Sequence, residues 1–385
     1  MSAKISNPFS TSKPHYEILD GLRGVAALMV IWYHVFEAFA TSPLDQRFNH
    51  GYLAVDFFFI LSGFVVGYAY DDRWKRNMGI KDFFKRRIIR LHPMVILGVL
   101  LGATAFFLQG SEKWDGSHVS LSMVMIAMLL NLFLLPAIPG SGPEIRGNGE
   151  MYPLNGPNWS LFFEYIGNIL YALFIHKLST KALTALVVAS GIGLASFALF
   201  NLSGYGHLGV GWTLADYNLP GGFLRVLFSF SMGLLMSRVF KPVKIRGAFW
   251  ICSALIVALL SVPHLGNEDS LWMNGIYDSL CIIVFFPLIV YLGASGQTTD
   301  KKSSAICKFM GDISYPVYVV HYPSMYLFYS WVWDNGLTFG QTWHVAAGLF
   351  VGNIVLAYIC LKCYDEPVRK YLTGRFQSSH KSNAC

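Results

Sequence analysis

Apolar residues in this chain come in blocks of about 16 to 22, and this feature constrains the fold more than any other. An α-helix needs about 20 residues to cross the ~30 Å hydrocarbon core of a bilayer. Hydrophobic residues make up 54% of the 385 residues and charged residues only 13%, which is about half the charged fraction of a soluble domain. The sequence therefore predicts an all-α, polytopic membrane bundle that occupies 1–385 as a single domain.

Short polar connections, or connections rich in Gly and Pro, separate the blocks and leave no room for a soluble domain. The helices should fall within about 19–362, and 363–385 should form a short tail. The first block has no following cleavage site, so it does not read as a signal peptide. Eleven blocks are visible, approximately 19–41, 52–70, 88–109, 120–136, 158–176, 183–201, 221–238, 247–262, 276–292, 310–331 and 343–362.

Basic residues distinguish the two sides of the membrane. Basic loops stay in the cytoplasm, so we expect both termini and 71–87 there, with 138–157 and 202–220 outside. An even number of crossings follows, so one block must enter without crossing. The charges leave 88–109 and 120–136 as the two candidates. We expect it to be 120–136, a short or re-entrant segment, which leaves about ten transmembrane helices. All but four of the 29 Lys and Arg residues fit this arrangement; the exceptions are Arg47, Lys113, Arg146 and Arg225.

Net charge and cysteines indicate no further partners. Inner loops that face anionic lipid account for the net charge of +7, so no nucleic-acid partner is expected. Cys360 and Cys363 form a CxxC pair, but a zinc site needs a second pair of ligands. We expect neither a metal site nor disulfides.

Ionisable side chains within the first block are the first candidates for function, because such groups are costly in hydrocarbon unless they face a cavity or a partner. Arg23 and His34 are eleven residues apart, which places them on one helix face and ~16 Å apart along it. Arg23 should lie at the cytoplasmic boundary and His34 near mid-membrane, with Glu37 on roughly the same face. The alternative is a histidine that only hydrogen-bonds a neighbouring helix.

Charged residues in the next two blocks extend this set. Asp56 falls inside the second block. In RRIIRLHP, Arg87 and Arg90 are one turn apart and can point at one anion, which guanidinium groups bind bidentately. The alternative reading of these arginines is ordinary anchoring on the positive side of the membrane.

Two later segments carry further polar residues. NWSLFFEYIGNILY places Trp159 at the outer interface and Glu164 about a turn and a half deeper. An aromatic belt explains the tryptophan but not the carboxylate. In GDISYPVYVVHYP, Asp312 begins the block and His321 lies deeper, and two prolines loosen the helix between and beside them.

Six motifs in this order resemble the membrane acyltransferase family 3: LDGLRGVAALMVIWYH, VDFFFILSGFVV, RRIIRLHP, NWSLFFEY, DISYPVYVVH and the closing YDEP. The resemblance spans nearly the whole chain. Its most specific elements are the Arg-x10-His of Arg23 and His34 and the Arg-x-x-Arg of Arg87 and Arg90, residues that are regarded as essential in the family.

The resemblance implies an integral-membrane O-acyltransferase of the cytoplasmic (inner) membrane. Members move an acyl group, usually acetyl, from cytoplasmic acyl-CoA to a hydroxyl of a cell-surface polysaccharide, glycolipid or lipid-linked precursor. The acyl-CoA is a donor substrate, so no permanently bound cofactor is expected. Many members carry a second, extracytoplasmic domain, whereas this chain looks like a stand-alone membrane domain. The acceptor would meet it directly or pass to a separate extracytoplasmic transferase.

Residue roles follow from the chemistry of acyl transfer. A hydroxyl needs a base, and His34 suits that role because its ordinary pKa is near neutral. Glu37 or Asp56 could fix its tautomer. The acyl-CoA phosphates would bind Arg23, Arg87 and Arg90. The acceptor side would be lined by Trp159, Glu164, Asp312 and His321.

Several alternatives stay open at this point. His34 can act as a base or form an acyl-histidine. The acceptor, the choice between acetyl and succinyl, and the oligomeric state are not specified by the sequence. A transporter or flippase of lipid-linked saccharides also uses polar broken helices, but this chain has no internal symmetry. A purely structural scaffold would not keep so many ionisable residues in the bilayer.

Overall fold

The computed structural model describes residues 15–204, 206–298 and 300–382 of the chain. These residues form a bundle of helices, and isolated β-bridges are the only strand-like pairings among them. The helices are α1 (Glu17–Glu37), η1 (His50–Leu53), α2 (Ala54–Lys75), α3 (Ile80–Leu108), α4 (Leu121–Leu132), α5 (Asn158–Leu173), η2 (Ile175–Lys177), α6 (Thr180–Leu199), α7 (Asn218–Val239), α8 (Ala248–Leu260), α9 (Trp272–Leu280), η3 (Cys281–Phe285), α10 (Phe286–Ser295), α11 (Lys301–Asp334), α12 (Phe339–Cys360), η4 (Leu361–Asp365) and α13 (Glu366–Ser382).

The helices confirm an all-α polytopic membrane bundle. Each of the eleven apolar blocks coincides with a helix. Within the described residues, seven helical stretches are long and apolar enough to cross a bilayer: Glu17–Glu37, His50–Lys75, Ile80–Leu108, Thr180–Leu199, Asn218–Val239, Trp272–Ser295 and Phe339–Arg375. The expected number of about ten crossings stays a prediction.

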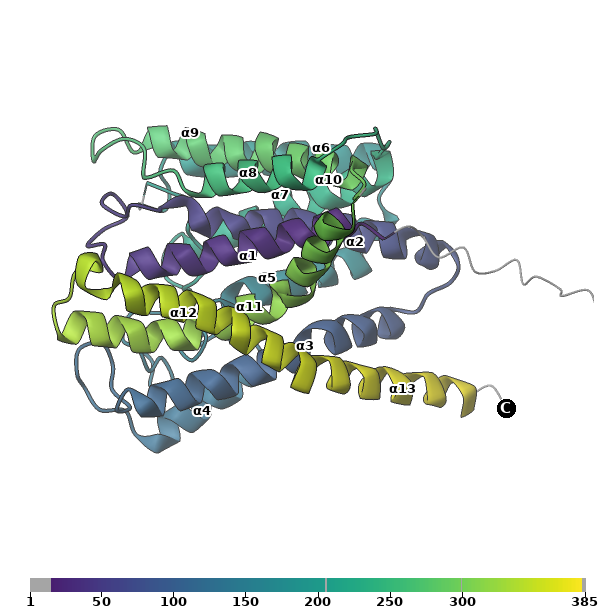
Figure 1. Cartoon of the computed structure of the whole chain (residues 1–385). Coiled ribbons are helices and arrows are strands. Elements are labelled where there is room, and N and C mark those ends of the chain that lie inside the picture. Colours follow the sequence, from purple (N-terminus) through teal and green to yellow (C-terminus); the bar gives the residue numbers. More distant parts are fainter. Residues whose placement is uncertain (1–14, 205, 299, 383–385) are drawn as a thin grey trace, which may run out of the picture.

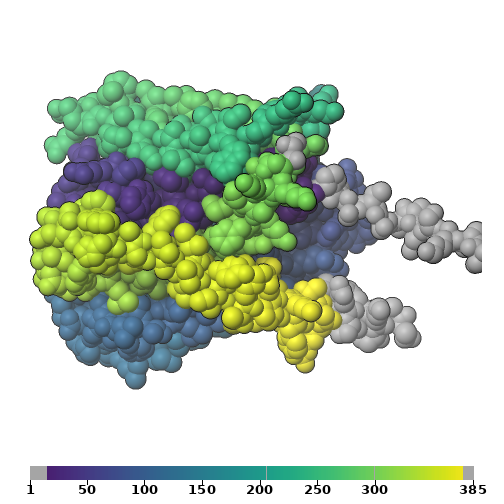
Figure 2. All heavy atoms as spheres, viewed as in Figure 1, coloured from purple at the N-terminus to yellow at the C-terminus, as the bar shows by residue number. Residues whose placement is uncertain are grey.

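The bundle has two distinct ends (Figure 1). At one of them α1 begins, α2 connects to α3, and α13 ends. We call it the basic end because the 71–90 region places eight Lys and Arg residues there. At the other, which we call the loop end, lie the longer connections, including 133–157 and the stretch between α6 and α7. Figure 2 shows α12 and α13 as one continuous ridge across the bundle, so the predicted tail 363–385 is largely helical.

Helices α1 and α11 pack against each other at the centre of the bundle. Glycine makes their closest approach possible: a Cβ at Gly24 would come within 2.3 Å of the Met310 carbonyl oxygen. Gly311 lies as closely against Asp20. Small residues commonly form such contacts between membrane helices, where backbones gain dispersion energy by close packing. This contact brings the first and the late motif-bearing helices together.

A buried ion pair joins α2 to α7. Asp56 and Arg225 are both fully buried, and Nη2 of the arginine lies 2.7 Å from Oδ2 of the aspartate. The guanidinium also donates to the carbonyl oxygens of Val210 (2.7 Å) and Tyr52 (2.9 Å). A charge in a dry interior is tolerated only when it is paired and hydrogen-bonded in this way. The pair therefore fixes the loop that carries Val210 against the start of α2.

Helix α4 has the geometry of a re-entrant segment. Its 12 residues span about 18 Å at 1.5 Å per residue, which is less than the ~30 Å hydrocarbon core. The chain then turns back. Ala137 donates from its backbone to Met151, and Gly142 lies against Met123 at the beginning of α4. The segment therefore folds back on itself, and the re-entrant assignment of 120–136 stays a prediction.

This geometry predicts the labelling pattern of cysteines placed around α4. In a variant without native cysteines, Ser117→Cys and Ser141→Cys should react with an impermeant maleimide from the same side of the membrane. Lys75→Cys, at the basic end, should react only from the other side. Labelling of positions 117 and 141 from opposite sides would show instead that α4 spans the bilayer.

The ion pair predicts a cost in stability when one partner is removed. Asp56→Ala should lower the free energy of unfolding by about 3–5 kcal/mol, because it leaves a buried guanidinium unpaired. Replacing both residues, as Asp56→Leu with Arg225→Met, should recover most of this loss. Thermal unfolding in detergent measures both variants. A stable Asp56→Ala protein would contradict the structural role of the pair.

Candidate active site

The last turn of α1 brings His34 and Glu37 together. Nδ1 of His34 lies 2.7 Å from Oε2 of Glu37, because residues three apart on a helix share a face. Tyr329 of α11 donates to the same carboxylate oxygen and to the His34 carbonyl oxygen, both at 2.9 Å. A carboxylate at Nδ1 favours the tautomer with the proton on that nitrogen. The lone pair of Nε2 is then available to accept a proton.

His321 of α11 stacks behind His34. The ring centroids are 5.4 Å apart with an interplanar angle of 29°. Nδ1 of His321 lies 3.1 Å from the Val317 carbonyl oxygen, and its buried Nε2 has no hydrogen-bond partner among the described residues. The structure therefore brings together two histidines that are distant in the sequence. Of the two, His34 is the one that faces the cavity described next.

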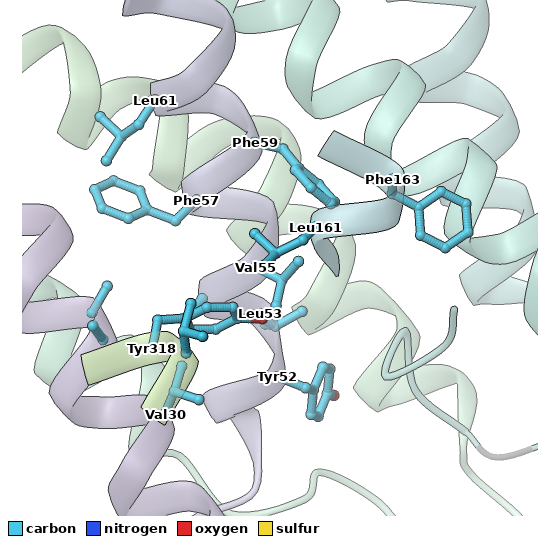
Figure 3. Packing of buried hydrophobic residues seen from close by; sticks show 14 of the residues in the cluster. Val30, Tyr52, Leu53, Val55, Phe57, Phe59, Leu61, Leu161, Phe163 and Tyr318 are labelled. Carbon is cyan, nitrogen blue, oxygen red and sulfur yellow. The ribbon is translucent and has the colours of Figure 1, made fainter. Parts of the chain in front are cut away.

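A cavity of about 400 Å³ opens beside this histidine. Its size is in the range of small-molecule binding sites. Helix residues Val30, Tyr52, Val55 and Tyr318 line its inner wall, and Figure 3 shows them close together. The remaining wall comes from connections at the loop end: 40–49, 148–157 and 207–212.

Trp159 lines the cavity. Glycine lets the loop between α6 and α7 pack on its ring. Gly211 has φ +111°, and a Cβ there would lie 2.8 Å from the indole. Arg225 reaches the same ring from the other side, with its Cζ 5.1 Å from the ring centroid. The tryptophan is therefore held in place by both the loop and the ion pair.

The three predicted donor-binding arginines lie toward the basic end. Arg23 donates to Asp20 (2.9 Å) and to the Ser314 hydroxyl (2.9 Å). Arg90 lies within electrostatic range of Arg23, Asp20 and other charges near the end of α12. Arg87 is 11% exposed and forms an ion pair with Glu164 at 2.6 Å. Of the two arginines of the Arg-x-x-Arg motif, Arg90 is therefore the one that is held less strongly by protein side chains.

Four predicted residues lie away from the positions expected for them: His321, which stacks behind His34, and Asp56, Glu164 and Asp312. Of the two carboxylates considered for orienting His34, Glu37 contacts it, whereas Asp56 pairs with Arg225. Glu164 pairs with Arg87 and accepts from the Ser62 hydroxyl at 2.9 Å, so it lies beside Arg87 and not on the cavity wall.

Asp312 is exposed near Lys362 at the basic end. The common physical reason is that spacing along one helix does not specify which neighbouring helix supplies the partner of a charge. His34 lies in the last turn of α1, which ends at Glu37, and its expected position near mid-membrane stays a prediction.

Other cavity residues were not predicted from the sequence. Tyr318 and Tyr322 of α11 line the cavity, and with Tyr326 and Tyr329 they follow a helical repeat of three to four residues. That repeat is a signal for one polar aromatic face. Glu150, Trp212 and His207 come from loops, where no periodic pattern exists. Across 15–204, 206–298 and 300–382, no group of three His, Cys, Asp or Glu side chains could hold a metal ion.

Comparison with known proteins identifies relatives of the chain. A family model described as an acyltransferase domain matches residues 16–362. "Protein 2 in picA locus" of Rhizobium radiobacter is 33% identical over 48% of this chain and 96% of that protein. "Acyltransferase MdmB" of Streptomyces mycarofaciens is 23% identical over 79% of this chain and 77% of that protein. "Putative O-acetyltransferase SACOL0978" of Staphylococcus aureus (strain COL) is 23% identical over 91% of this chain, which spans 57% of that relative.

No solved structure matches the chain significantly. The family match nevertheless covers every element of the site, from the arginine and histidine of α1 to the tyrosines of α11. The chain belongs to the acyltransferase domain family and is an integral-membrane O-acyltransferase.

Proposed function

We propose that this protein moves an acetyl group from acyl-CoA, bound at the basic end, to a hydroxyl of a cell-surface glycan or its precursor in the cavity. The observation that carries the proposal is the pairing of His34 with Glu37 on the cavity wall. The histidine lies on the same helix as Arg23, ~16 Å away along its axis. One helix thus connects an arginine-rich end to a candidate base.

The charge distribution supports a cytoplasmic donor. Basic connections face the cytoplasm in membrane proteins, which puts the basic end, and with it both chain ends, on that side of the inner membrane. CoA is made in the cytoplasm and carries several phosphates, which guanidinium groups bind well. Its long flexible arm separates these phosphates from the thioester. Such a donor can bind at the arginines while its thioester extends toward His34.

The reaction needs one proton transfer in each direction. The acceptor hydroxyl gives its proton to Nε2 of His34 as its oxygen attacks the thioester carbonyl carbon. The C–O bond forms and a tetrahedral oxyanion results. The intermediate then expels the CoA thiolate, which takes the proton from the imidazolium. Glu37 stabilises that imidazolium while it exists, and Tyr329 keeps the carboxylate in place. Direct attack by Nε2 would instead give an acyl-histidine intermediate.

The role of His34 is tested by labelling cells with radioactive acetate and measuring ester-linked label on surface glycan. Cells with the wild-type protein should incorporate label, and His34→Ala should lower the rate roughly 10²–10⁴-fold at an equal membrane level of protein. The exposed His344 of α12 provides a matched control, since His344→Ala should leave labelling unchanged.

Two results would contradict this assignment. Labelling by His34→Ala within a few-fold of the wild type would remove the histidine from the mechanism. An unlabelled glycan in wild-type cells, whose export nevertheless depends on the protein, would support the transporter or flippase alternative.

The donor role of the arginines is tested on Arg90. Arg90→Ala should weaken acyl-CoA binding to the purified protein by about 1.5–3 kcal/mol, the contribution of a charge-assisted hydrogen bond. Arg90→Lys should recover only part of the loss, because an ammonium lacks the guanidinium fork. Titration calorimetry measures both, with Lys81→Ala in the same region as the control. Normal binding by Arg90→Ala would show that this arginine only anchors the helix.

A further inference from the structure

Polar aromatic rings dominate the wall of the cavity. They come from four helices (α1, η1, α5 and α11) and from the loop between α6 and α7, and comprise Tyr33, Tyr52, Tyr318, Tyr322, Trp159 and Trp212. Such rings offer an apolar face together with a hydroxyl or an N–H at the edge. A sugar ring has the complementary surface, with C–H faces and hydroxyl edges. The wall is therefore suited to a polyhydroxylated ring.

Cations are missing from this wall among the described residues. Its charged side chains are the carboxylates Glu37 and Glu150, with His34 and His207 as the titratable rings. The nearest guanidinium groups are buried behind it: Arg225 is paired with Asp56. An anionic ligand group in such a cavity would lose its hydration without gaining a cationic partner, which is costly.

Arg146, the other buried guanidinium near the cavity, is held by the loop that carries Glu150. It donates to the Pro153 carbonyl oxygen at 2.9 Å and to Gln109. Its Cζ lies 3.7 Å from the centroid of the Tyr326 ring. The same tyrosine donates its hydroxyl hydrogen to Glu150. The arginine therefore supports Glu150 through the tyrosine without reaching the cavity wall itself.

Hydrogen bonds hold the Glu150 carboxylate in place but do not use all of its acceptor positions. One oxygen accepts from Tyr326 and the other from the Asn148 amide at 2.9 Å. A carboxylate has about four lone-pair positions, so each oxygen can accept one more hydrogen bond. A backbone bridge between residues 150 and 213 ties this loop to the one that carries Trp212. The Glu150 carboxylate, which can only accept hydrogen bonds, therefore lies close to the Trp212 loop at the loop end of the cavity.

We infer that the cavity takes an uncharged sugar unit of the acceptor, and that Glu150 positions it by accepting hydrogen bonds from its hydroxyls. This inference rests on the proposed function and names its substrate class. Phosphate or carboxylate groups of an acceptor stay outside the cavity, because two carboxylates and no cation line it. Glu150 is a positioning residue that sets which hydroxyl faces Nε2 of His34.

Binding of small glycosides to the purified full chain tests the inference. The probes are methyl glucoside, galactoside and mannoside, each beside the corresponding methyl uronide, which differs by a carboxylate. Fluorescence of the tryptophans in the wall and the shift in thermal unfolding report binding. At least one neutral glycoside should bind, and its uronide should bind roughly tenfold or more weakly, since like charges in an interface repel.

Substitution at position 150 separates positioning from a structural role. Glu150→Gln should weaken binding of the neutral glycoside about tenfold, as loss of a hydrogen bond to a charged group does. It should also reduce the preference over the uronide, because one repelling charge is gone. Glu144→Gln, a buried carboxylate in the same loop that lies outside the wall, should leave both quantities unchanged.

Three results would overturn the inference: uronides that bind as tightly as neutral glycosides, no binding of any of the six probes, or equal weakening of both classes in Glu150→Gln. The third result would make the residue merely structural. Acyl-CoA binding and the His34-dependent acetate label are measured on the same proteins. If these persist while glycoside selectivity fails, the proposed function stands and only its assigned acceptor class is wrong.

Discussion

The close contact between α1 and α11 is the constraint on which the site depends. Gly24 lets the two backbones meet at the Met310 carbonyl. On either side of that point, side chains of α11 form hydrogen bonds with side chains of α1. The Ser314 hydroxyl accepts from Arg23, and Tyr329 donates to Glu37 and so holds it beside His34. A side chain at residue 24 would separate the helices and disturb both ends together. The arginine-rich end and the histidine are therefore parts of one rigid unit.

Relationships within a single helix could be predicted from the sequence, since the helical repeat fixes which residues share a face. The contact between His34 and Glu37 is one example. Contacts between residues of different helices could not be predicted in this way. Asp56 was a reasonable candidate for orienting the histidine, yet its partner is Arg225 from a helix more than 160 residues later. Which helices adjoin is decided by packing of their surfaces, and local spacing carries no information about it.

Cavity residues at the loop end could not be predicted from the sequence for a different reason. Apolar blocks predicted eleven helical segments, including the short α4, but not α13. Loop residues that line the cavity, such as Glu150 and Trp212, follow no repeat. Their positions depend on glycines with positive φ, on a β-bridge between two loops and on hydrogen bonds to α11. On the helices the sequence did point to this wall, through His34, Glu37 and Trp159 and through the tyrosine repeat of α11.

The ion pair between α2 and α7 has a consequence for biogenesis. Membrane proteins are synthesised from the N-terminus at a limited rate, so α2 leaves the ribosome well before α7. During that interval the Asp56 carboxylate has no guanidinium partner and is costly to leave in hydrocarbon. Until Arg225 arrives, α2 is tolerated in the bilayer only with the carboxyl protonated, hydrated or shielded by neighbouring helices. The ionised pair therefore forms late in synthesis, when the seventh α-helix reaches the second.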